Sequence, residues 1–351
     1  MDEAAIKSRL PAPIAHRLQA VRISGGTVSL VVDAHGLDEG ARQALDRAAK
    51  EALRGMEGIT ETRVALVADR AAPEHDAPAA NAPAPAAERR SATIQPPPPG
   101  VPPIIAVGSG KGGVGKSTLT ANLAVALKRA GRRVGVVDAD IYGPSIPKIF
   151  ATEDARPESE GAKLIPVTGA AGIPALSMGH LVEADRAIAW RGPMIGKAMA
   201  QLIDAHWGDA EMLLIDLPPG TGDVQLTMLQ RFRPAGAVIV STPQDLALMD
   251  AKRAAQLFEV AGVPLVGLVE NMAGYECPHC HEVSDPFGRG GVEAAAAGMQ
   301  VPFLGRIPLA LEIREGGDAG NPTAAGEGPQ AEAFRDVAAK LSDWLTRHKV
   351  V

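Results

Sequence analysis

The glycine-rich stretch "GSGKGGVGKST", residues 108–118, decides the fold of this 351-residue chain. It follows the apolar run "IIAVGS" (104–109), which is typical of a buried strand. It leads into "STLTANLAVALKRAG" (117–131), which has apolar residues at helical spacing. The three segments predict a strand, a glycine loop and a helix in direct succession.

Four residues of this loop match the spacing G-x-x-x-x-G-K-[S/T], namely Gly110, Gly115, Lys116 and Ser117. The glycines let backbone N–H groups surround phosphate oxygens, and the N-terminus of the following helix favours an anion. We therefore expect Lys116 to reach the β- and γ-phosphates of a nucleotide. The Ser117 hydroxyl is predicted to bind Mg²⁺.

Strand and helix patterns alternate through the rest of residues 101–351. Several strands are continuous apolar runs, as expected when helices cover both faces of a parallel sheet. The pattern predicts an α/β domain with a doubly wound, mostly parallel sheet and ligands at the C-terminal ends of its strands. After 104–109, the predicted strands span residues 133–140, 173–178, 211–217, 236–242, 264–271 and 302–308.

Acidic residues end two of these strands. "VVDADIYGPS" (136–145) carries Asp138 and Asp140, and "LLIDLPPGTGD" (213–223) carries Asp216. In this topology, both strand ends flank the phosphate loop. We assign Asp140, in preference to Asp138, to orienting the attacking water, and Asp216 to the Mg²⁺ side of the site. Gly220 is free to turn its backbone N–H toward the γ-phosphate.

The N-terminal third has a different composition. Residues 71–100 hold 18 Ala or Pro in 30 positions and almost no large apolar side chain, which predicts a disordered linker. Residues 1–70 read as a small α+β module, with strands at 27–33 and 60–69 around a helix at 38–56. This module carries no catalytic cluster and is interpreted as a docking or assembly unit.

Bulk properties limit the possible functions. The net charge is −6 and the pI about 5.8, which argues against nucleic acid or an anionic membrane as the main ligand. "MDEAAIKSRL" lacks the apolar core of a signal peptide, and no apolar run is long enough to span a membrane. With two cysteines and no export signal, we expect a cytoplasmic protein whose thiols are free or bind a metal.

Lys111 is a second lysine inside the loop. "GKGGVGKST" resembles the deviant Walker A motif of the MinD/ParA class of P-loop ATPases. In that class the extra lysine reaches across a dimer interface to the partner's nucleotide. The resemblance therefore implies an ATP-linked homodimer and a catalytic role for Lys111.

Further blocks extend the resemblance to one family. Together with the loop, they resemble the Mrp/ApbC family of iron–sulfur cluster carrier ATPases, in order, over residues 100–330. Residues 1–70 resemble the small iron–sulfur assembly domain of that family, but "VVDAHGLDEG" (31–40) lacks its cysteine. The blocks are "VVDADIYGPSIPKI" (136–149), "WRGPM" (190–194), "LLIDLPPGTGDVQLT" (213–227), "STPQDLALMDAKRA" (241–254), "GLVENMAGYECPHC" (267–280) and "FGRGGVEAAA" (287–296).

The family implies a carrier that passes a cluster from scaffold proteins to apo-proteins, with ATP gating its loading or release. Each subunit of a homodimer would donate Cys277 and Cys280 to one bridging [4Fe–4S] cluster, since a cubane takes four thiolates. Asn271 would contact the adenine. The implied nucleotide site also comprises Asp138, Gly220 and the loop residues Gly110, Lys111, Gly112, Gly113, Val114, Gly115, Lys116, Ser117 and Thr118.

The residues around the two cysteines leave alternatives open. "GYECPHCHE" (274–282) is compatible with a dimer-bridging zinc site, because zinc also takes four thiolates. A thioredoxin-like redox pair requires a helix after the first cysteine, whereas "HEVSDPFGRGG" (281–291) is a poor helix former. His279 and His281 could join a mononuclear site, but solvated loop histidines are the simpler interpretation.

A positioning or partition ATPase like MinD or ParA, acting on membrane or DNA, is the alternative of another class. "AEAFRDVAAKLSDWLTRHKVV" (331–351) has an apolar stripe that could bind a membrane surface. A packed last helix of the domain is the preferred interpretation, because its polar face mixes acidic and basic residues.

Overall fold

The computed structural model of the chain describes residues 6–7, 9–24, 27–33, 39–54, 56, 61–67, 99–141, 143–169, 171–181, 192–220 and 222–351. The chain divides into two compact units, residues 1–87 and 88–351. Most of the predicted linker, and Trp190 and Arg191 of the quoted blocks, lie outside the described residues. The predicted domain boundaries therefore stay predictions.

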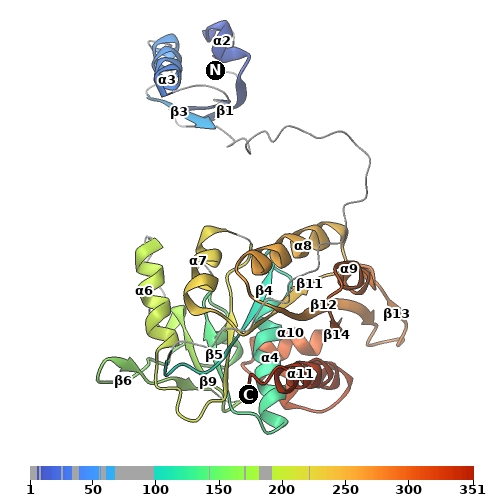
Figure 1. Cartoon of the computed structure of the whole chain (residues 1–351). Helices are drawn as coiled ribbons and strands as arrows, with labels where there is room; N and C mark the ends of the chain where they lie inside the picture. Colours follow the sequence, from blue (N-terminus) through green and yellow to red (C-terminus); the bar gives the residue numbers. More distant parts are fainter. Residues whose placement is uncertain are drawn as a thin grey trace, which may run out of the picture. The chain divides into compact units, whose positions relative to one another are not determined.

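The described residues of the small unit form a three-stranded sheet with helices (Figure 1). β1 pairs with β2 antiparallel, and β2 pairs with β3 in parallel, so the connection between the last two must cross over through α3. Val28, Leu30 and Val32 alternate along β2 and are fully buried. The elements are α2 (Ala12–Ala15), β1 (Leu18–Ser24), β2 (Thr27–Asp33), α3 (Glu39–Leu53) and β3 (Glu61–Val67).

Among the described residues of the large unit, nine strands form one sheet. Its order is β13-β12-β11-β4-β10-β5-β9-β8, and β14 also pairs with β12. Pairing is parallel except at β8 and β13. The strands are β4 (Ile104–Ser109), β5 (Val134–Asp138), β8 (Val167–Thr168), β9 (Pro174–Ser177), β10 (Met212–Asp216), β11 (Gly236–Ser241), β12 (Leu265–Glu276), β13 (Val283–Ser284) and β14 (Phe303–Leu309).

Helices cover both faces of this sheet (Figure 1). On β4, Ile105 and Val107 pack into one apolar cluster, while Ile104 and Ala106 pack into the other. One cluster includes residues of α4 (Lys116–Arg129), α5 (Ile146–Ile149), α10 (Leu311–Asp318) and α11 (Pro329–Arg347). The other includes residues of α6 (Gly192–Ile203), α7 (Asp223–Phe232), α8 (Asp245–Val260) and α9 (Gly291–Met299). Remaining short elements are β6 (Ser159–Glu160), β7 (Lys163–Leu164), η1 (Met178–His180) and η2 (Thr323–Ala325).

This arrangement confirms the predicted doubly wound, mostly parallel sheet. The predicted strand 264–271 was too short. In the structure, β12 continues past Asn271 to Glu276 and pairs there with β13. The apolar stripe of α11, from Phe334 to Leu345, is buried against the sheet. Within the described part of the chain, every helix is too short or too polar to cross a membrane.

Candidate nucleotide site and cysteine hairpin

The glycine loop lies between β4 and α4, at the C-terminal end of the central strand. A β-carbon on Gly110 would come within 2.2 Å of the Asp250 carbonyl on α8, so this position needs glycine. Gly115 has a φ of 81°, and a β-carbon there would lie 2.1 Å from Asn271 Nδ2. The loop can therefore approach both neighbours only with these two glycines.

Asp216, at the end of β10, joins the loop to the neighbouring strand. Its carboxylate lies 2.8 Å from Lys116 Nζ, and it accepts a hydrogen bond of 2.6 Å from the Ser117 hydroxyl. Thr120 Oγ1 lies 2.9 Å from the second carboxylate oxygen. Asp216 is fully buried, so these contacts supply the partners that a carboxylate needs away from water. The structure thus brings Lys116, Ser117 and Asp216 together, as the sequence predicted, and adds Thr120.

Asp138 lies at the end of β5, and nearby residues of the chain donate hydrogen bonds to its carboxylate. Its carboxylate accepts hydrogen bonds from the backbone N–H of Asp140 (3.0 Å) and Ile146 (3.1 Å), and from the Ser177 hydroxyl (3.0 Å). Burial, and secondly the charge of Asp216, raise the pKa of Asp138 to about 7. Asp138 therefore fixes the turn that leads to Asp140.

Asp140 lies in that turn at the same edge of the sheet. It is 8% exposed, and its carboxylate accepts a 3.3 Å hydrogen bond from the backbone N–H of Gly143. In the segment that follows β10, the backbone N–H of Gly220 donates to the Ser109 carbonyl at 3.1 Å, and Gly220 has a φ of 100°. The loop after β10 is thereby tied to the start of the glycine loop.

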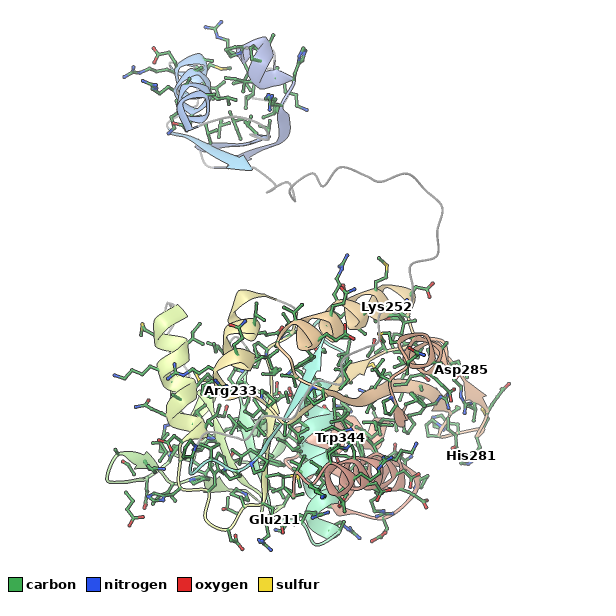
Figure 2. All side chains as sticks on the ribbon, viewed as in Figure 1. Glu211, Arg233, Lys252, His281, Asp285 and Trp344 are labelled. Atoms are coloured by element: carbon green, nitrogen blue, oxygen red, sulfur yellow. The ribbon has the colours of Figure 1, made fainter. Side chains whose placement is uncertain are left out.

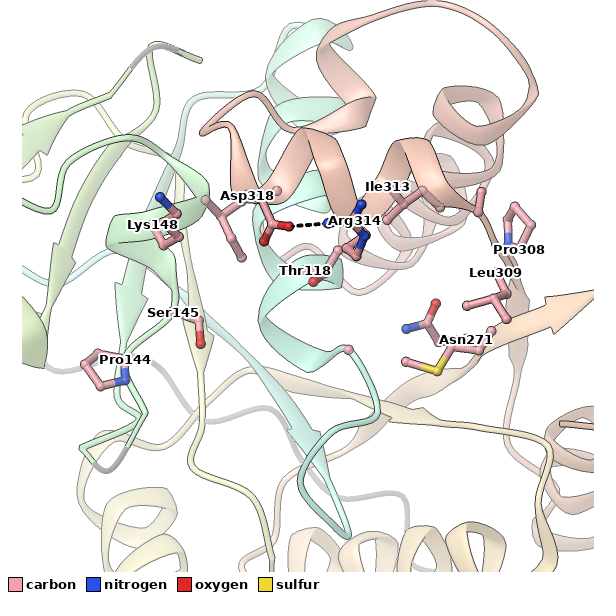
Figure 3. A pocket seen from close by; sticks show the side chains of 15 residues that line it. Thr118, Pro144, Ser145, Lys148, Asn271, Pro308, Leu309, Ile313, Arg314 and Asp318 are labelled. Atoms are coloured by element: carbon pink, nitrogen blue, oxygen red, sulfur yellow. Dashed lines mark hydrogen bonds and ion pairs between the residues drawn. The ribbon is translucent and has the colours of Figure 1, made fainter. Parts of the chain in front are cut away.

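A cavity of about 460 Å³ opens beside the C-terminal end of the glycine loop (Figure 3). Gly115 and Thr118 line it, and so does Asn271 of β12. Asn271 Nδ2 donates a 2.8 Å hydrogen bond to the Val114 carbonyl, which ties β12 to the loop. Pro308 and Leu309 of β14 supply apolar surface. The size and mixed lining suit a small organic ligand.

The side chain of Lys111 contacts a residue, Gln244, that the sequence motifs did not identify. Its ammonium lies 3.4 Å from Gln244 Oε1, at the residue before α8. The Thr242 hydroxyl donates to the same oxygen at 3.3 Å. Nothing in the motif marks Gln244, since its position depends on the packing of α8 beside the loop.

The two cysteines lie in the hairpin that joins β12 to β13. The backbone N–H of Cys277 donates to the Glu282 carbonyl (3.0 Å), and that of His281 donates to the Cys277 carbonyl (2.9 Å). Hydrogen bonds from the backbone N–H groups of Cys280 and His279 lower the pKa of the Cys277 thiol. Cys277 is partly exposed, and Cys280 is exposed.

The histidines of this hairpin face outward. His281 has a φ of 60°, and its Nδ1 lies 2.9 Å from the Glu276 carboxylate. Figure 2 shows His281 at the outer edge of the unit, near Asp285. Among the described residues, no three His, Cys, Asp or Glu side chains are arranged to hold a metal ion. The hairpin also carries the two free thiols, of which that of Cys280 is exposed.

Fold and loop together define a P-loop NTPase. Residues 100–342 match the family model described as NUBPL iron-transfer P-loop NTPase, and the chain belongs to this family. This confirms the resemblance found in the sequence motifs.

Three similar proteins have names that agree with this family. The chain is 47% identical over 259 residues to an iron–sulfur cluster carrier protein of Haemophilus influenzae, covering 73% of this chain and 70% of the relative. It is 44% identical over 240 residues to a carrier of the same name from Methanocaldococcus jannaschii, covering 68% and 83%. A mitochondrial iron–sulfur protein required for NADH dehydrogenase in Arabidopsis thaliana is 46% identical over 243 residues, covering 68% and 77%.

Solved structures share the fold. An ADP complex of a nucleotide-binding protein from Archaeoglobus fulgidus is 39% identical with a TM-score of 0.58, covering 66% of this chain and 91% of that chain. The cell division ATPase MinD of Pyrococcus furiosus is 25% identical with a TM-score of 0.51, covering 69% and 98%.

Proposed function

We propose that this protein binds and hydrolyses ATP and carries a [4Fe–4S] cluster, bridged between two copies of the chain, to apo-proteins. The main observation behind the proposal is the path of strand β12. It holds Asn271 at the cavity beside the glycine loop and continues to Glu276, directly before Cys277. One strand thus joins the nucleotide site to the thiols. The names of the relatives support the cargo, and the ADP-bound neighbour supports the nucleotide.

The loop fits a nucleotide phosphate. Its glycines leave room for backbone N–H donors, and Lys116 and Ser117 begin α4. The Ser117 hydroxyl and the Asp216 carboxylate are oxygen ligands of the kind that Mg²⁺ prefers. When bound, Mg²⁺ offsets the charge of the β- and γ-phosphates. We infer that Lys116 then contacts a phosphate oxygen instead of Asp216. The charge of Asp216 would then be offset by Mg²⁺ in place of the Lys116 ammonium.

Two further residues are assigned to hydrolysis. We propose that Asp140 orients the attacking water, from its place at the strand end beside the loop. Lys111, which lies against Gln244 within one chain, is proposed to reach the nucleotide of a second copy. The backbone N–H of Gly220 is not free as the sequence suggested, because it donates to the Ser109 carbonyl, so we propose that it turns to the γ-phosphate only by giving up that bond.

The cysteine hairpin fits the cargo. A cubane cluster takes four thiolates, and each chain has two cysteines. Two chains around a two-fold axis supply the set. The lowered pKa of Cys277 favours the thiolate that binds iron. Recipients are proposed to be apo iron–sulfur proteins, with scaffold proteins as donors.

We infer that β12 couples the two sites. Met272 has a φ of 59° and Gly274 a φ of 79°, and the pairing of β12 with β14 shifts register between Asn271 and Tyr275. Such a bulge is an irregularity that small changes in backbone angles can adjust. Met272 lines the cavity and lies five residues before Cys277. Binding of a nucleotide in the cavity would thus change the conformation of the cysteine hairpin through this short, irregular part of β12.

Anaerobic reconstitution followed by metal analysis and absorption spectroscopy tests the cargo. The expected result is a brown protein with about four irons per two chains. Cys277→Ala should lose the absorbance band. His281→Asn is the matched control, because asparagine tolerates the left-handed backbone and the exposed imidazole is not needed for binding. Zinc in place of iron, or an unchanged band in Cys277→Ala, would refute the cluster assignment.

A further inference from the structure

Helix α7 carries a polar side chain on a face that is otherwise apolar. Gln225 is 4% exposed, so its amide is buried. Its neighbours on that face, at helical spacing, pack into the apolar cluster that also holds Leu217; they are Met228, Leu229 and Phe232. Burial of an amide among apolar side chains is unfavourable unless its polar atoms find partners.

One polar atom of this amide has a partner and the other has none. Gln225 Nε2 donates a hydrogen bond to the carbonyl of Pro218, which is buried. Among the described residues, Gln225 Oε1 is the buried side-chain polar atom that lacks a hydrogen-bond partner. A buried acceptor without a partner lowers the stability of the fold, and an apolar side chain would remove that cost. Packing therefore does not account for a glutamine here, whereas its bond to Pro218 does.

Pro218 begins the short segment that leads from β10 past the glycine loop to α7. Two residues of this segment border the loop. The backbone N–H of Gly220 donates to the Ser109 carbonyl at 3.1 Å, and a β-carbon on Gly112 would lie 3.9 Å from Pro219 Cγ. A displacement of the Pro218 carbonyl would therefore change the position of the segment at the phosphate end of the proposed nucleotide site.

The composition of residues 218–220 restricts where the backbone can turn. Pro218 and Pro219 have fixed φ angles and no N–H, so neither can donate a hydrogen bond to a phosphate. Gly220 has a φ of 100° and no side chain, so its backbone can take up other angles. While Gln225 holds the Pro218 carbonyl, the N–H of Gly220 is the adjustable donor of these three residues.

We propose that Gln225 is a positioning residue for ATP hydrolysis, because it anchors residues 218–220 while Gly220 turns its backbone N–H from Ser109 to the γ-phosphate. The inference rests on the proposed ATP hydrolysis and adds a residue outside the glycine loop and the cavity. Without the anchor, the whole segment can shift, and the donor is no longer held where charge develops in the transition state. Misplacement of such a group costs about tenfold to a hundredfold in rate.

Gln225→Met tests the proposal in the full-length protein, because methionine is flexible and apolar and fills the site without an amide. The substitution removes the anchor of Pro218 and also the unpaired oxygen, so its two effects on stability oppose each other. The expected results are a urea midpoint close to that of the wild type and a kcat for ATP hydrolysis lowered about tenfold or more. ADP affinity, measured by calorimetric titration, should be unchanged because ADP has no γ-phosphate.

Gln230→Met is the matched control, because Gln230 is exposed on the same helix. It should hydrolyse ATP like the wild type. A wild-type kcat in Gln225→Met would overturn the proposal, and so would a parallel loss of ADP affinity, which would assign Gln225 to nucleotide binding. A loss of kcat accompanied by a large fall in the urea midpoint would also overturn it, by assigning the side chain a structural role.

A second variant tests the path from Gln225 to Gly220. Pro219 is exposed, so Pro219→Gly should fold, and it frees the backbone beside Gly220. We expect a lowered kcat with unchanged ADP affinity. Because both substitutions loosen the same segment, the double variant should hydrolyse ATP about as slowly as the slower single variant. Losses that multiply in the double variant would contradict an action of Gln225 through this segment.

The wild-type protein separates this inference from the proposed function. A wild type that binds ADP but releases no phosphate from ATP would refute the proposed hydrolysis, and the positioning role with it. A wild type that hydrolyses ATP, together with an equally active Gln225→Met, would refute the positioning role alone.

Discussion

The nucleotide site and the cysteine hairpin differ in how their polar groups are satisfied. Lys116 and Asp216 are 6% and 0% exposed and pair with each other, with Ser117 and Thr120 completing the set. In the hairpin, by contrast, hydrogen bonds order the backbone, while Cys280 is exposed. The buried polar groups of the loop find their partners within one chain, whereas in the proposed function the hairpin presents two thiols to a ligand shared with another chain. We therefore expect nucleotide binding to need less help from assembly than cluster binding does.

The largest expected effect separates the two sites. Lys116→Ala should lower ATP hydrolysis about a hundredfold or more, because it removes the cation that stabilises phosphate charge. Cluster loading should persist, because the hairpin does not contact Lys116. Phosphate release and iron content, measured on the same preparation, check both results.

Lys128→Ala is the control, since Lys128 lies at the other end of α4 and contacts the Ala171 and Gly172 carbonyls. Wild-type hydrolysis in Lys116→Ala would defeat the assigned phosphate site. A thermal melt should accompany the comparison, because Asp216 remains buried without its cation.

The strand shared by both sites gives the second prediction. Glu270, fully buried on β12, accepts hydrogen bonds from the backbone N–H of Gly290 and Val292 and from Arg306 Nε, at 2.9 to 3.0 Å. Glu270→Ala should lower the free energy of unfolding by about 3 kcal/mol, because the partly buried Arg306 guanidinium and two N–H donors lose their acceptor.

Glu293 contacts the same Arg306 from an exposed position. Glu293→Ala should therefore cost less than about 1 kcal/mol. Urea unfolding of both variants measures the contrast, and equal effects would show that burial of the Glu270 carboxylate is not what anchors β12.

The last prediction concerns the pH dependence of stability. The pKa of Asp138 is about 7 in the folded protein, against 3.8 as the usual value. Between those values the folded protein keeps a proton that the unfolded chain has released, so its stability falls as pH rises and levels off above about pH 7. The asparagine side chain of Asp138→Asn does not titrate, so this variant should not show that fall in stability.

Urea unfolding of Asp138→Asn and wild type between pH 4 and 8 tests this linkage. The difference in unfolding free energy should shift in favour of the variant as pH rises toward 7, because only the wild type holds a proton that the unfolded chain has released. Asp209→Asn, at an exposed aspartate, should follow the wild type. A pH-independent difference for Asp138→Asn would contradict a proton held at this carboxyl.

Much of the fold and site was predictable from local patterns. Continuous apolar strands and the G-x-x-x-x-G-K-[S/T] spacing indicate a doubly wound sheet with a phosphate loop. Strand-end acids at Asp140 and Asp216 follow from the shared edge of parallel strands. Ser117 and Asp216 are 99 residues apart in sequence, yet the topology brings them into contact.

Other contacts depend on tertiary packing. Thr120 carries a weak signal, being three residues after Ser117 and so on the same helix face. Gln244 contacts Lys111 because α8, which follows Gln244, packs beside the glycine loop, and no local pattern specifies that placement. The extension of β12 was missed because Met272 and Gly274 interrupt the strand pattern with left-handed backbone.

Native mass spectrometry of the anaerobically reconstituted protein tests the central claim most directly. The account predicts a species of two chains with one [4Fe–4S] cluster, absent from Cys277→Ala and present in His281→Asn. A cluster held by a single chain, a zinc adduct, or a cluster-bearing dimer of Cys277→Ala would contradict it.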